Sequence, residues 1–365
     1  MTAPFSVVAG DPRAEQRVMT QRQSELARLM NLRGDLRIDF ITSAALQGNA
    51  LGDSAERPVA VYVPPHYDPQ GSRRYPVLYC LHGYTGNTAA LLSVRPWELN
   101  VVQRMDALVA RTEMEPALLV LVDGFTRLGG SQYVNSIHNG DYATYVVRDV
   151  IGHVDGAYRT VASEGGRAVL GKSSGGFGAL HLCMRYPGVF TAFASHSGDS
   201  YFRYAQMRGF ATLQRTLEKY EWNIAKFVEH FEDANKRPQH EYEAMEMLGY
   251  AAAYSPRSAT PFDLDLPIER QSGELREDVF GLWLSFDPAE DCLGKQAELR
   301  RLRLRYVDCG RRDEYALDIG ARVLVRRMRE MGLQVRHEEF DDDHRNIGYR
   351  YDISLPALAG VLERA

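Results

Sequence analysis

The stretch that decides the fold is Arg167-Ala168-Val169-Leu170-Gly171-Lys172-Ser173-Ser174-Gly175-Gly176. A short apolar run leads into the pattern Gly-x-Ser-x-Gly, and a helical pattern follows directly, from Gly178 to Cys183. A strand that turns sharply into a helix lifts the serine between them above the edge of a sheet, where its hydroxyl is exposed. The pattern predicts Ser173 as a nucleophile. Ser174 is the rival serine, but two residues before it stands Lys172 and not a glycine.

Runs typical of strands extend to both sides of this turn, and several are apolar almost throughout, as in strands buried on both faces. They lie at Arg37–Thr42, Pro58–Val63, Pro76–Leu81, Ala117–Val122, Arg167–Leu170, Phe190–Ser195, Leu302–Val307 and Gln334–Phe340. Helical patterns lie between the later runs, at residues 97–111, 141–158, 175–185, 318–331 and 352–364. This alternation predicts an α/β fold with an eight-stranded, mostly parallel sheet covered by helices on both faces. The first two strands have no helix between them, so we expect them to form an antiparallel edge.

The stretch 201–295 between the sixth and seventh strands is too long for a loop in a compact domain. Residues 205–231 and 240–254 are predicted to be helices rich in aromatic residues, whereas 255–291 is rich in Pro and Asp. We expect a helical cap at 201–295, inserted into a core formed by 35–200 and 296–365. An N-terminal extension, 1–34, contains a helical pattern over 12–32. That helix packs on its own domain or on a second subunit of a homodimer.

A serine nucleophile needs a base, and the base needs a carboxylate that orients it. In α/β-hydrolases both follow the serine, beyond late strands and in the order acid then histidine. His344 lies in the loop after the last predicted strand, whereas His337 lies within that strand, His181 in the helix after Ser173, and His82 early in the fold. His344 is therefore the predicted base. The acid is Asp313, Asp308 or Glu314, which all follow the seventh strand.

The oxyanion that forms during acyl transfer requires backbone N–H donors. One usually belongs to the residue after the nucleophile, here Ser174, and the other to the loop after the third strand. That loop, Leu81-His82-Gly83-Tyr84-Thr85-Gly86-Asn87, contains a glycine turn that could present the N–H of Tyr84.

Several motifs in the same order resemble the esterase D-like family, which includes feruloyl esterases, S-formylglutathione hydrolases, enterochelin esterases and mycolyltransferases. They are Pro58–Pro65, Tyr75–Gly83, Asp123-Gly124, Tyr133–Ser136, Gly140–Tyr142, Gly171–Leu180 and Asp308–Asp313. The resemblance covers roughly residues 35–200 and 300–360. It implies a triad of Ser173, Asp313 and His344, with Ser174 and Tyr84 as oxyanion donors. Asp-Asp precedes His344 where the family usually has Gly-Gly or Gly-Ser, and the cap is longer than in feruloyl esterases.

These observations predict a serine carboxylic ester hydrolase that works through an acyl-enzyme on a small-molecule ester, without cofactor or metal. An acyltransferase, a thioesterase or lactone hydrolase, a peptidase and a non-enzymatic binding module are the alternatives. Part of the aromatic content of the cap is expected to line an apolar substrate pocket, with Trp222 and Tyr254 as candidates and Asn135 as a further one.

The composition excludes several other classes of protein. A net charge of −5 and a pI near 6.1 provide no basic surface for nucleic acid or an anionic membrane. No apolar run approaches the length that spans a bilayer, and no secretory leader is visible. The four cysteines form no Cys-x-x-Cys pair, which indicates free thiols and a cytoplasmic protein.

Overall fold

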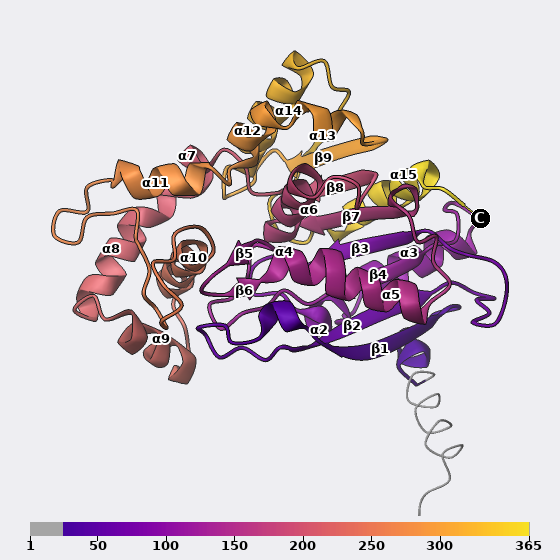
Figure 1. Cartoon of the computed structure of the whole chain (residues 1–365), viewed down its shortest axis with the longest axis horizontal. Coiled ribbons are helices and arrows are strands. Elements are labelled where there is room, and N and C mark those ends of the chain that lie inside the picture. The colour runs from indigo at the N-terminus through magenta and orange to yellow at the C-terminus, as the bar shows by residue number, and fades with distance from the viewer. Residues whose placement is uncertain (1–24, 365) are drawn as a thin grey trace, which may run out of the picture.

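The computed structural model describes residues 25–364, and its centre is one eight-stranded sheet (Figure 1). The strands lie in the order β1 (Asp35–Thr42), β2 (Glu56–Val63), β4 (Leu118–Val122), β3 (Val77–Leu81), β7 (Arg167–Lys172), β8 (Ala192–His196), β9 (Leu304–Gly310) and β10 (Arg336–Phe340). The strand β2 is antiparallel to both β1 and β4, and the other pairs are parallel. The eight strands and the antiparallel edge predicted from the sequence are confirmed. A short antiparallel hairpin, whose strands β5 (Asn135–Ser136) and β6 (Gly140–Asp141) have two residues each, was not predicted.

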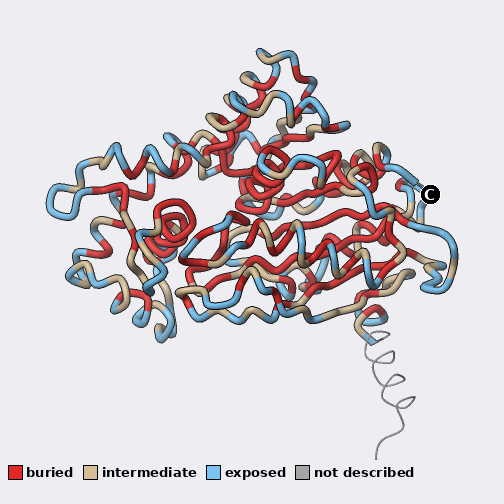
Figure 2. Tube along the Cα trace, viewed as in Figure 1, coloured by how far each residue is buried: buried red, intermediate tan, exposed pale blue. Residues whose placement is uncertain are grey.

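Two apolar layers cover the two faces of the sheet, and side chains alternate between them along each strand. In β3, Val77 and Tyr79 face one layer and Leu78 and Cys80 the other. The first layer contains the segment α4 (Tyr142–Thr144), η2 (Tyr145–Val150) and α5 (Ile151–Ala157), together with α6 (Ser174–Arg185) and α14 (Leu317–Glu330). The second contains α3 (Val101–Ala110) and α15 (Tyr351–Val361). Figure 2 shows the strands buried along most of their length, which explains why their sequences are apolar without alternation.

The N-terminal helix is only partly described. Residues 25–29 are helical. Met30 is buried in the second apolar layer, and the partly buried Leu26 packs against the same layer. The described end of this helix therefore packs on its own domain. Residues 12–24 of the predicted helix, including Val18 and Met19, lie outside the described residues. Within residues 25–364, no helix is both long and apolar enough to cross a membrane.

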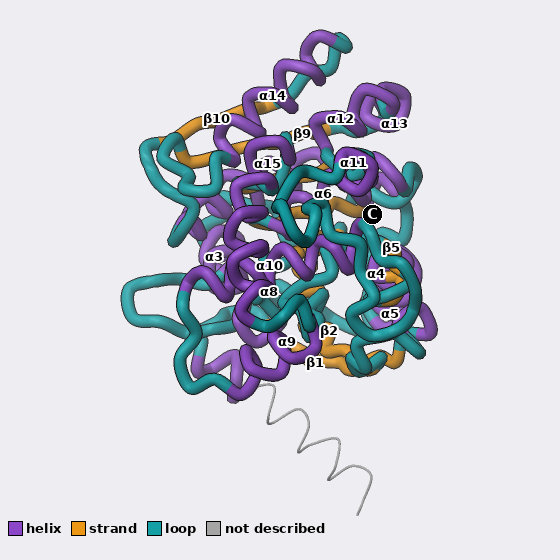
Figure 3. Tube along the Cα trace, turned by 90° about the vertical axis from the view of Figure 1, so that its left-hand side faces the viewer, coloured by secondary structure: helices purple, strands orange, loops and turns teal. Residues whose placement is uncertain are grey.

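The insertion between β8 and β9 is helical. It contains α7 (Phe202–Ala205), η4 (Met207–Gly209), α8 (Phe210–Lys219), α9 (Ile224–Asp233), α10 (Gln239–Tyr254), α11 (Glu277–Leu284), α12 (Pro288–Asp291), η5 (Cys292–Gly294) and α13 (Gln296–Arg300). The helices α8 to α11 gather at one end of the sheet, on the left of Figure 1 and towards the viewer in Figure 3. By contrast, Ala289, Cys292 and Leu299 belong to the first apolar layer of the core.

The single helix predicted over 205–231 is wrong. The helix α8 ends at Lys219, and Glu221 and Trp222 adopt left-handed backbone angles (φ of 55° and 61°) that no helix continues through. The side chain of Asn223 then accepts a hydrogen bond from the N–H of Lys226 and begins α9. The helix α11 lies in the stretch 255–291, which is rich in Pro and Asp and for which no helix was predicted, although its apolar residues Val279, Phe280 and Trp283 are buried.

The cap has an aromatic core of its own. Tyr254 is buried and stacks on Phe202 and Phe286, with ring centroids 5.6 and 4.9 Å apart. It also contacts Phe177 of α6 edge-on, at 5.9 Å. Tyr254 therefore joins the cap to the helix that follows Ser173.

We predict that Tyr254→Ala lowers the free energy of unfolding by about 3–5 kcal/mol, because it leaves a large cavity among packed rings. The matched control is Tyr204→Ala on α7, whose side chain is 52% exposed, and it should cost less than about 1 kcal/mol. Chemical denaturation monitored by circular dichroism measures both. Equal losses for the two variants would contradict the role given to Tyr254.

Candidate active site

Ser173 stands at the junction of β7 and α6 with a backbone conformation that non-glycine residues rarely adopt. Its φ and ψ are 58° and −126°. The N–H of Ser173 donates to the carbonyl oxygen of His196 at the end of β8, at 2.9 Å. Such a strained conformation costs energy and persists only where the surrounding structure imposes it. The predicted strand, sharp turn and helix are thus present at this serine.

The two glycines of the motif are required by close backbone packing. A Cβ atom on Gly175 would lie 2.2 Å from the carbonyl oxygen of Leu81, and one on Gly171 would lie 2.4 Å from the carbonyl carbon of Gly175. Both distances are far inside van der Waals contact with backbone atoms, which cannot move aside. The glycines therefore let β3, β7 and α6 meet directly beneath Ser173.

His344 lies beyond β10 in the loop expected from the sequence, and its ring is paired with Asp313. His344 Nδ1 lies 2.8 Å from Asp313 Oδ2, and both residues are buried. Burial raises the pKa of Asp313, but the hydrogen bond from His344 and its charge outweigh burial and hold this pKa below its usual value. The carboxylate of Asp313 therefore stays ionised and can accept the proton on His344 Nδ1.

The other two acid candidates have different partners. Glu314 Oε2 accepts the backbone N–H of His344 at 2.9 Å, so it holds the loop rather than the ring. Asp308 is fully buried, where its Oδ1 lies 2.7 Å from His196 Nδ1 and its Oδ2 accepts from Arg350 Nε at 2.9 Å. Of the three carboxyls that the sequence left open, only Asp313 contacts the imidazole of His344.

The loop after β3 presents the backbone groups expected of an oxyanion site. Among the described residues, neither the Tyr84 N–H nor the Ser174 N–H donates to a protein acceptor. His82 fixes this loop: its Nδ1 lies 2.8 Å from the carbonyl oxygen of Gly83, and its Nε2 accepts the N–H of Gly124 at 2.8 Å. Tyr133 donates to the carbonyl oxygen of His82 at 2.8 Å. Sequence reasoning gave His82 and Tyr133 no such role, because their partners are distant in the chain.

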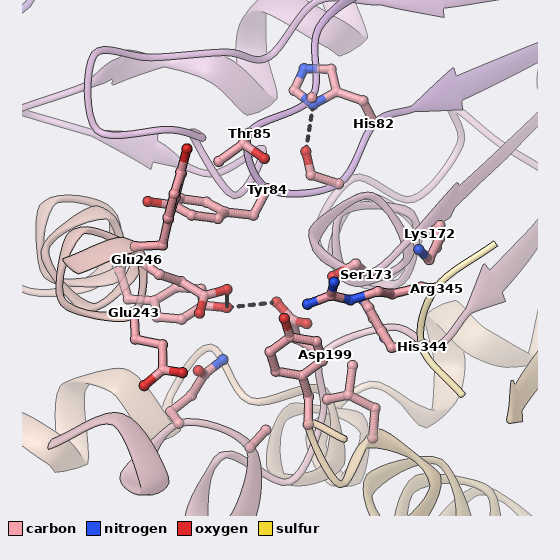
Figure 4. A pocket seen from close by; sticks show the side chains of 18 of the residues that line it. His82, Tyr84, Thr85, Lys172, Ser173, Asp199, Glu243, Glu246, His344 and Arg345 are labelled. Carbon is pink, nitrogen blue, oxygen red and sulfur yellow. Dashed lines mark hydrogen bonds between the residues drawn. The ribbon is translucent and has the colours of Figure 1, made fainter. Parts of the chain in front are cut away.

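Ser173, His344 and Tyr84 line one cavity of about 570 Å³ (Figure 4). Residues from the core and from the cap share its wall, and they are His82, Gly83, Tyr84, Thr85, Gly86, Ala90, Leu91, Lys172, Ser173, Asp199, Ala205, Gln206, Arg208, Gln239, Tyr242, Glu243, Glu246, Tyr250, Tyr315, Leu317, His344 and Arg345. The cavity thus lies between the carboxyl ends of the parallel strands and the face of α10, where ligands of open α/β sheets usually bind.

None of the three residues suggested for the substrate pocket lines this cavity. Asn135 is exposed and its side-chain amide is bonded to Thr144. Trp222 stands in the turn between α8 and α9, beneath the guanidinium of Arg270. Tyr254 is enclosed in the aromatic core of the cap. For Tyr254 the reason is that an aromatic residue in a helix packs inward more often than it lines a pocket, whereas Asn135 lies in a hairpin and Trp222 in a turn away from the cavity.

The cap contributes polar groups that the sequence analysis missed. Burial raises the pKa of Asp199 to about 7, helped by the neighbouring Glu246. Burial also raises the pKa of Glu246 to about 7, although Arg208 and a hydrogen bond from Tyr250 oppose it. The cavity-lining residues of α10 stand at positions 239, 242, 243, 246 and 250, and this helical spacing is the one signal in the sequence that could have identified them.

Part of the chain is similar in sequence to known esterases. Residues 49–225 match the family described as "Putative esterase". An esterase of Mycobacterium tuberculosis is 33% identical over 146 residues, which are 40% of this chain and 30% of that protein. An endo-1,4-beta-xylanase/feruloyl esterase of Xylanibacter ruminicola is 27% identical over 128 residues, 35% of this chain and 17% of the relative. The chain therefore spans less than a third of the length of these curated relatives.

Solved structures share the fold over nearly the whole chain. A ferulic acid esterase superposes with a TM-score of 0.56 at 18% identity, covering 91% of this chain and 99% of that one. An S-formylglutathione hydrolase from Agrobacterium tumefaciens gives 0.55 at 16% identity, covering 91% and 97%. The α/β-hydrolase fold is confirmed, and with the family match over 49–225 so is the resemblance to the esterase D-like family.

The raised pKa values of the carboxyls in the cavity lead to a prediction about stability. A carboxyl whose pKa is higher in the folded than in the unfolded protein contributes stability below its unfolded pKa and loses it as the pH rises through the folded pKa, here about 7. Asp199→Asn removes this loss. We expect the free energy of unfolding of Asp199→Asn, compared with that of the unchanged protein, to increase by at least about 1 kcal/mol when the pH rises from about 5 to about 8.5.

Melting temperatures and urea titrations at both pH values measure this gain. The matched control is Asp233→Asn, an exposed carboxyl at the end of α9. A stability difference between Asp199→Asn and the unchanged protein that does not vary with pH would contradict the prediction.

Proposed function

Taking as premise that this chain is related to the esterases over residues 49–225, we propose that it is a serine carboxylic ester hydrolase with Ser173 as nucleophile. The observation that carries the proposal is the pairing of His344 with Asp313 in the cavity that contains the strained turn at Ser173. Three separately placed chain segments supply these groups, which a protein that only binds a ligand would not need.

In the first half of the proposed reaction, the Ser173 hydroxyl attacks the ester carbonyl carbon and passes its proton to His344 Nε2. The negative charge of Asp313 stabilises the imidazolium that forms. The carbonyl oxygen becomes an oxyanion, which the N–H groups of Tyr84 and Ser174 bind, and each such donor lowers the barrier by about 2.7–4 kcal/mol. The C–O bond then breaks, the imidazolium protonates the leaving alcohol, and an acyl group remains on Ser173.

In the second half, His344 takes a proton from water, and the oxygen of that water attacks the acyl carbon. The same two N–H groups bind the second oxyanion. When it collapses, the bond to Ser173 breaks, the imidazolium returns a proton to the serine oxygen, and a carboxylic acid leaves. No group beyond this chain and a water molecule is needed for either half.

The insertion is proposed to act as a cap that determines substrate choice. Its helix α10 forms the wall of the cavity opposite Ser173, while the aromatic core around Tyr254 holds the helix in place. A wall made by an insertion can differ in shape and charge while the triad beneath it stays the same.

The nucleophile can be tested by covalent labelling. A fluorophosphonate probe should label the protein once, and Ser173→Ala should abolish both labelling and hydrolysis of p-nitrophenyl acetate, because it removes the hydroxyl that the strained turn presents to the cavity. Ser174→Ala is the matched control, since it keeps the backbone N–H and should still be labelled. Mass spectrometry that locates the adduct on Ser174 would refute the assignment.

The acid can be tested by comparing two aspartates of the same strand end. We expect Asp313→Asn to reduce kcat by at least about 10³-fold with a modest loss of stability, because the imidazole loses its orientation and its counter-charge. Asp308→Asn should instead cost about 3–5 kcal/mol of stability, because Arg350 and His196 lose the fully buried carboxylate that both contact and Arg350 keeps only the part-exposed Glu338 as an anionic partner.

Stopped-flow or steady-state kinetics and denaturant titrations separate these two effects. If Asp308→Asn were stable and inactive while Asp313→Asn stayed active, the acid would have to be assigned to Asp308.

A further inference from the structure

The wall of the cavity opposite Ser173 carries three carboxyl groups that form no ion pair. Asp199 follows β8, and Glu243 and Glu246 lie one turn apart on α10. Among the described residues, no Lys, Arg or His nitrogen lies within 4.0 Å of any of these carboxyls, whereas the chain contains many ion pairs elsewhere. Figure 4 shows Glu243 and Glu246 on the side away from Lys172 and Ser173. A protein that places charges in a cavity without pairing them leaves them free for a ligand of opposite charge.

Two of the carboxyls share a single hydroxyl. The Tyr250 oxygen lies 3.2 Å from Asp199 Oδ2 and 3.2 Å from Glu246 Oε1. Tyr250 has one proton to share between them, so neither carboxylate receives a full hydrogen bond from it unless the other carboxyl is protonated. The pair therefore carries less than its full negative charge while the cavity contains only water. A cation that approached it would restore full ionisation and gain the attraction of both groups.

The same part of the cavity is lined by aromatic rings. Tyr84, Tyr242, Tyr250 and Tyr315 all contribute to the wall. The guanidinium of Arg208 already lies over the ring of Tyr315, 4.3 Å from its centroid. Aromatic faces combined with carboxylates are the arrangement by which proteins recognise ammonium groups, including quaternary ones.

An independent observation comes from Gln206. Its side chain lines the cavity and is only 2% exposed, and its Nε2 atom is buried without a hydrogen-bond partner. A buried amide donor that stays unsatisfied costs free energy, so an acceptor on a bound molecule would remove this cost. The Tyr84 hydroxyl is likewise buried without a partner. The cavity is therefore built for a polar occupant, and a long hydrocarbon chain would leave these groups unsatisfied.

Resting on the proposed ester hydrolase function, we propose that the substrate carries an ammonium group, which binds between Asp199 and Glu246 while the ester carbonyl lies at Ser173. The carboxyls attract the positive charge, the tyrosine rings exclude water around it, and Gln206 donates to an oxygen of the same substrate. An anionic substituent at this wall would meet the three carboxyls, because two of the cations that line the cavity, Lys172 and Arg345, lie on the side of Ser173 and the third, Arg208, lies over the ring of Tyr315. A metal ion fits less well, because within residues 25–364 no three His, Cys, Asp or Glu side chains are grouped to hold one.

The test compares two esters of equal shape and different charge, acetylcholine and 3,3-dimethylbutyl acetate. We expect kcat/KM to be at least ten-fold higher for the cationic ester. Calorimetry with the corresponding alcohols, choline and 3,3-dimethylbutanol, should show tighter binding of choline by a similar factor, and this measurement requires no turnover. Glu246→Gln should reduce both preferences at least five-fold. Glu229→Gln, an exposed carboxyl on α9, changes the net charge equally and should retain them.

The outcomes separate the two proposals. If both esters are hydrolysed at the same rate and choline binds no better than its isostere, the ammonium site is refuted and the hydrolase proposal stands. If choline binds preferentially and neither these esters nor p-nitrophenyl acetate is cleaved, the hydrolase proposal is refuted and the ammonium site stands. A preference that survives in Glu246→Gln refutes the assignment to this carboxyl pair. If a neutral sugar inhibited ester hydrolysis more strongly than choline does, the proposed positive charge of the substrate would be refuted.

Discussion

The turn at Ser173 is the constraint on which the other parts of the site depend. A serine in this conformation must be held by its surroundings, and here the carbonyl oxygen of His196 holds its N–H while Gly171 and Gly175 let three backbone segments meet beneath it. Any Cβ atom at these glycines would push β3, β7 and α6 apart. The same close approach brings the loop after β3 beside Ser173, so the proposed nucleophile and the proposed oxyanion donors are positioned by one packing contact.

Asp308 and Asp313, two aspartates near the end of β9, have different partners because they lie at different places relative to the end of the strand. Asp308 is still within the strand, where the neighbouring strand and α15 enclose it, so only buried partners such as His196 and Arg350 can reach it. Asp313 lies beyond the strand, and the chain turns back after Gly310 towards the loop that contains His344. Asp308, which contacts buried partners in the core, and Asp313, which contacts His344 at the cavity, thus lie only five positions apart in the chain.

The cap combines a dry interior with a polar inner face. Its aromatic cluster, in which Tyr254 contacts the helix behind the nucleophile, supplies the apolar burial that a helical insertion needs. Neither Glu243 nor Glu246 belongs to that cluster, so packing of the cap does not depend on them. The cost of burying Glu246 and Asp199, which raises the pKa of each, is typical of groups retained for binding.

The amino-acid sequence by itself determined the strand and helix order, the antiparallel edge, the turn at Ser173 and the loop position of His344, because these depend on local periodicity and on small residues at fixed spacing. It could not choose between Asp308 and Asp313, since both follow the same strand and only the fold of the loop decides which one reaches the imidazole. It also misplaced the pocket in Asn135, Trp222 and Tyr254. Which face of a helix covers a cavity depends on how the helices of the cap pack against one another and on the sheet, and only the tertiary structure decides that.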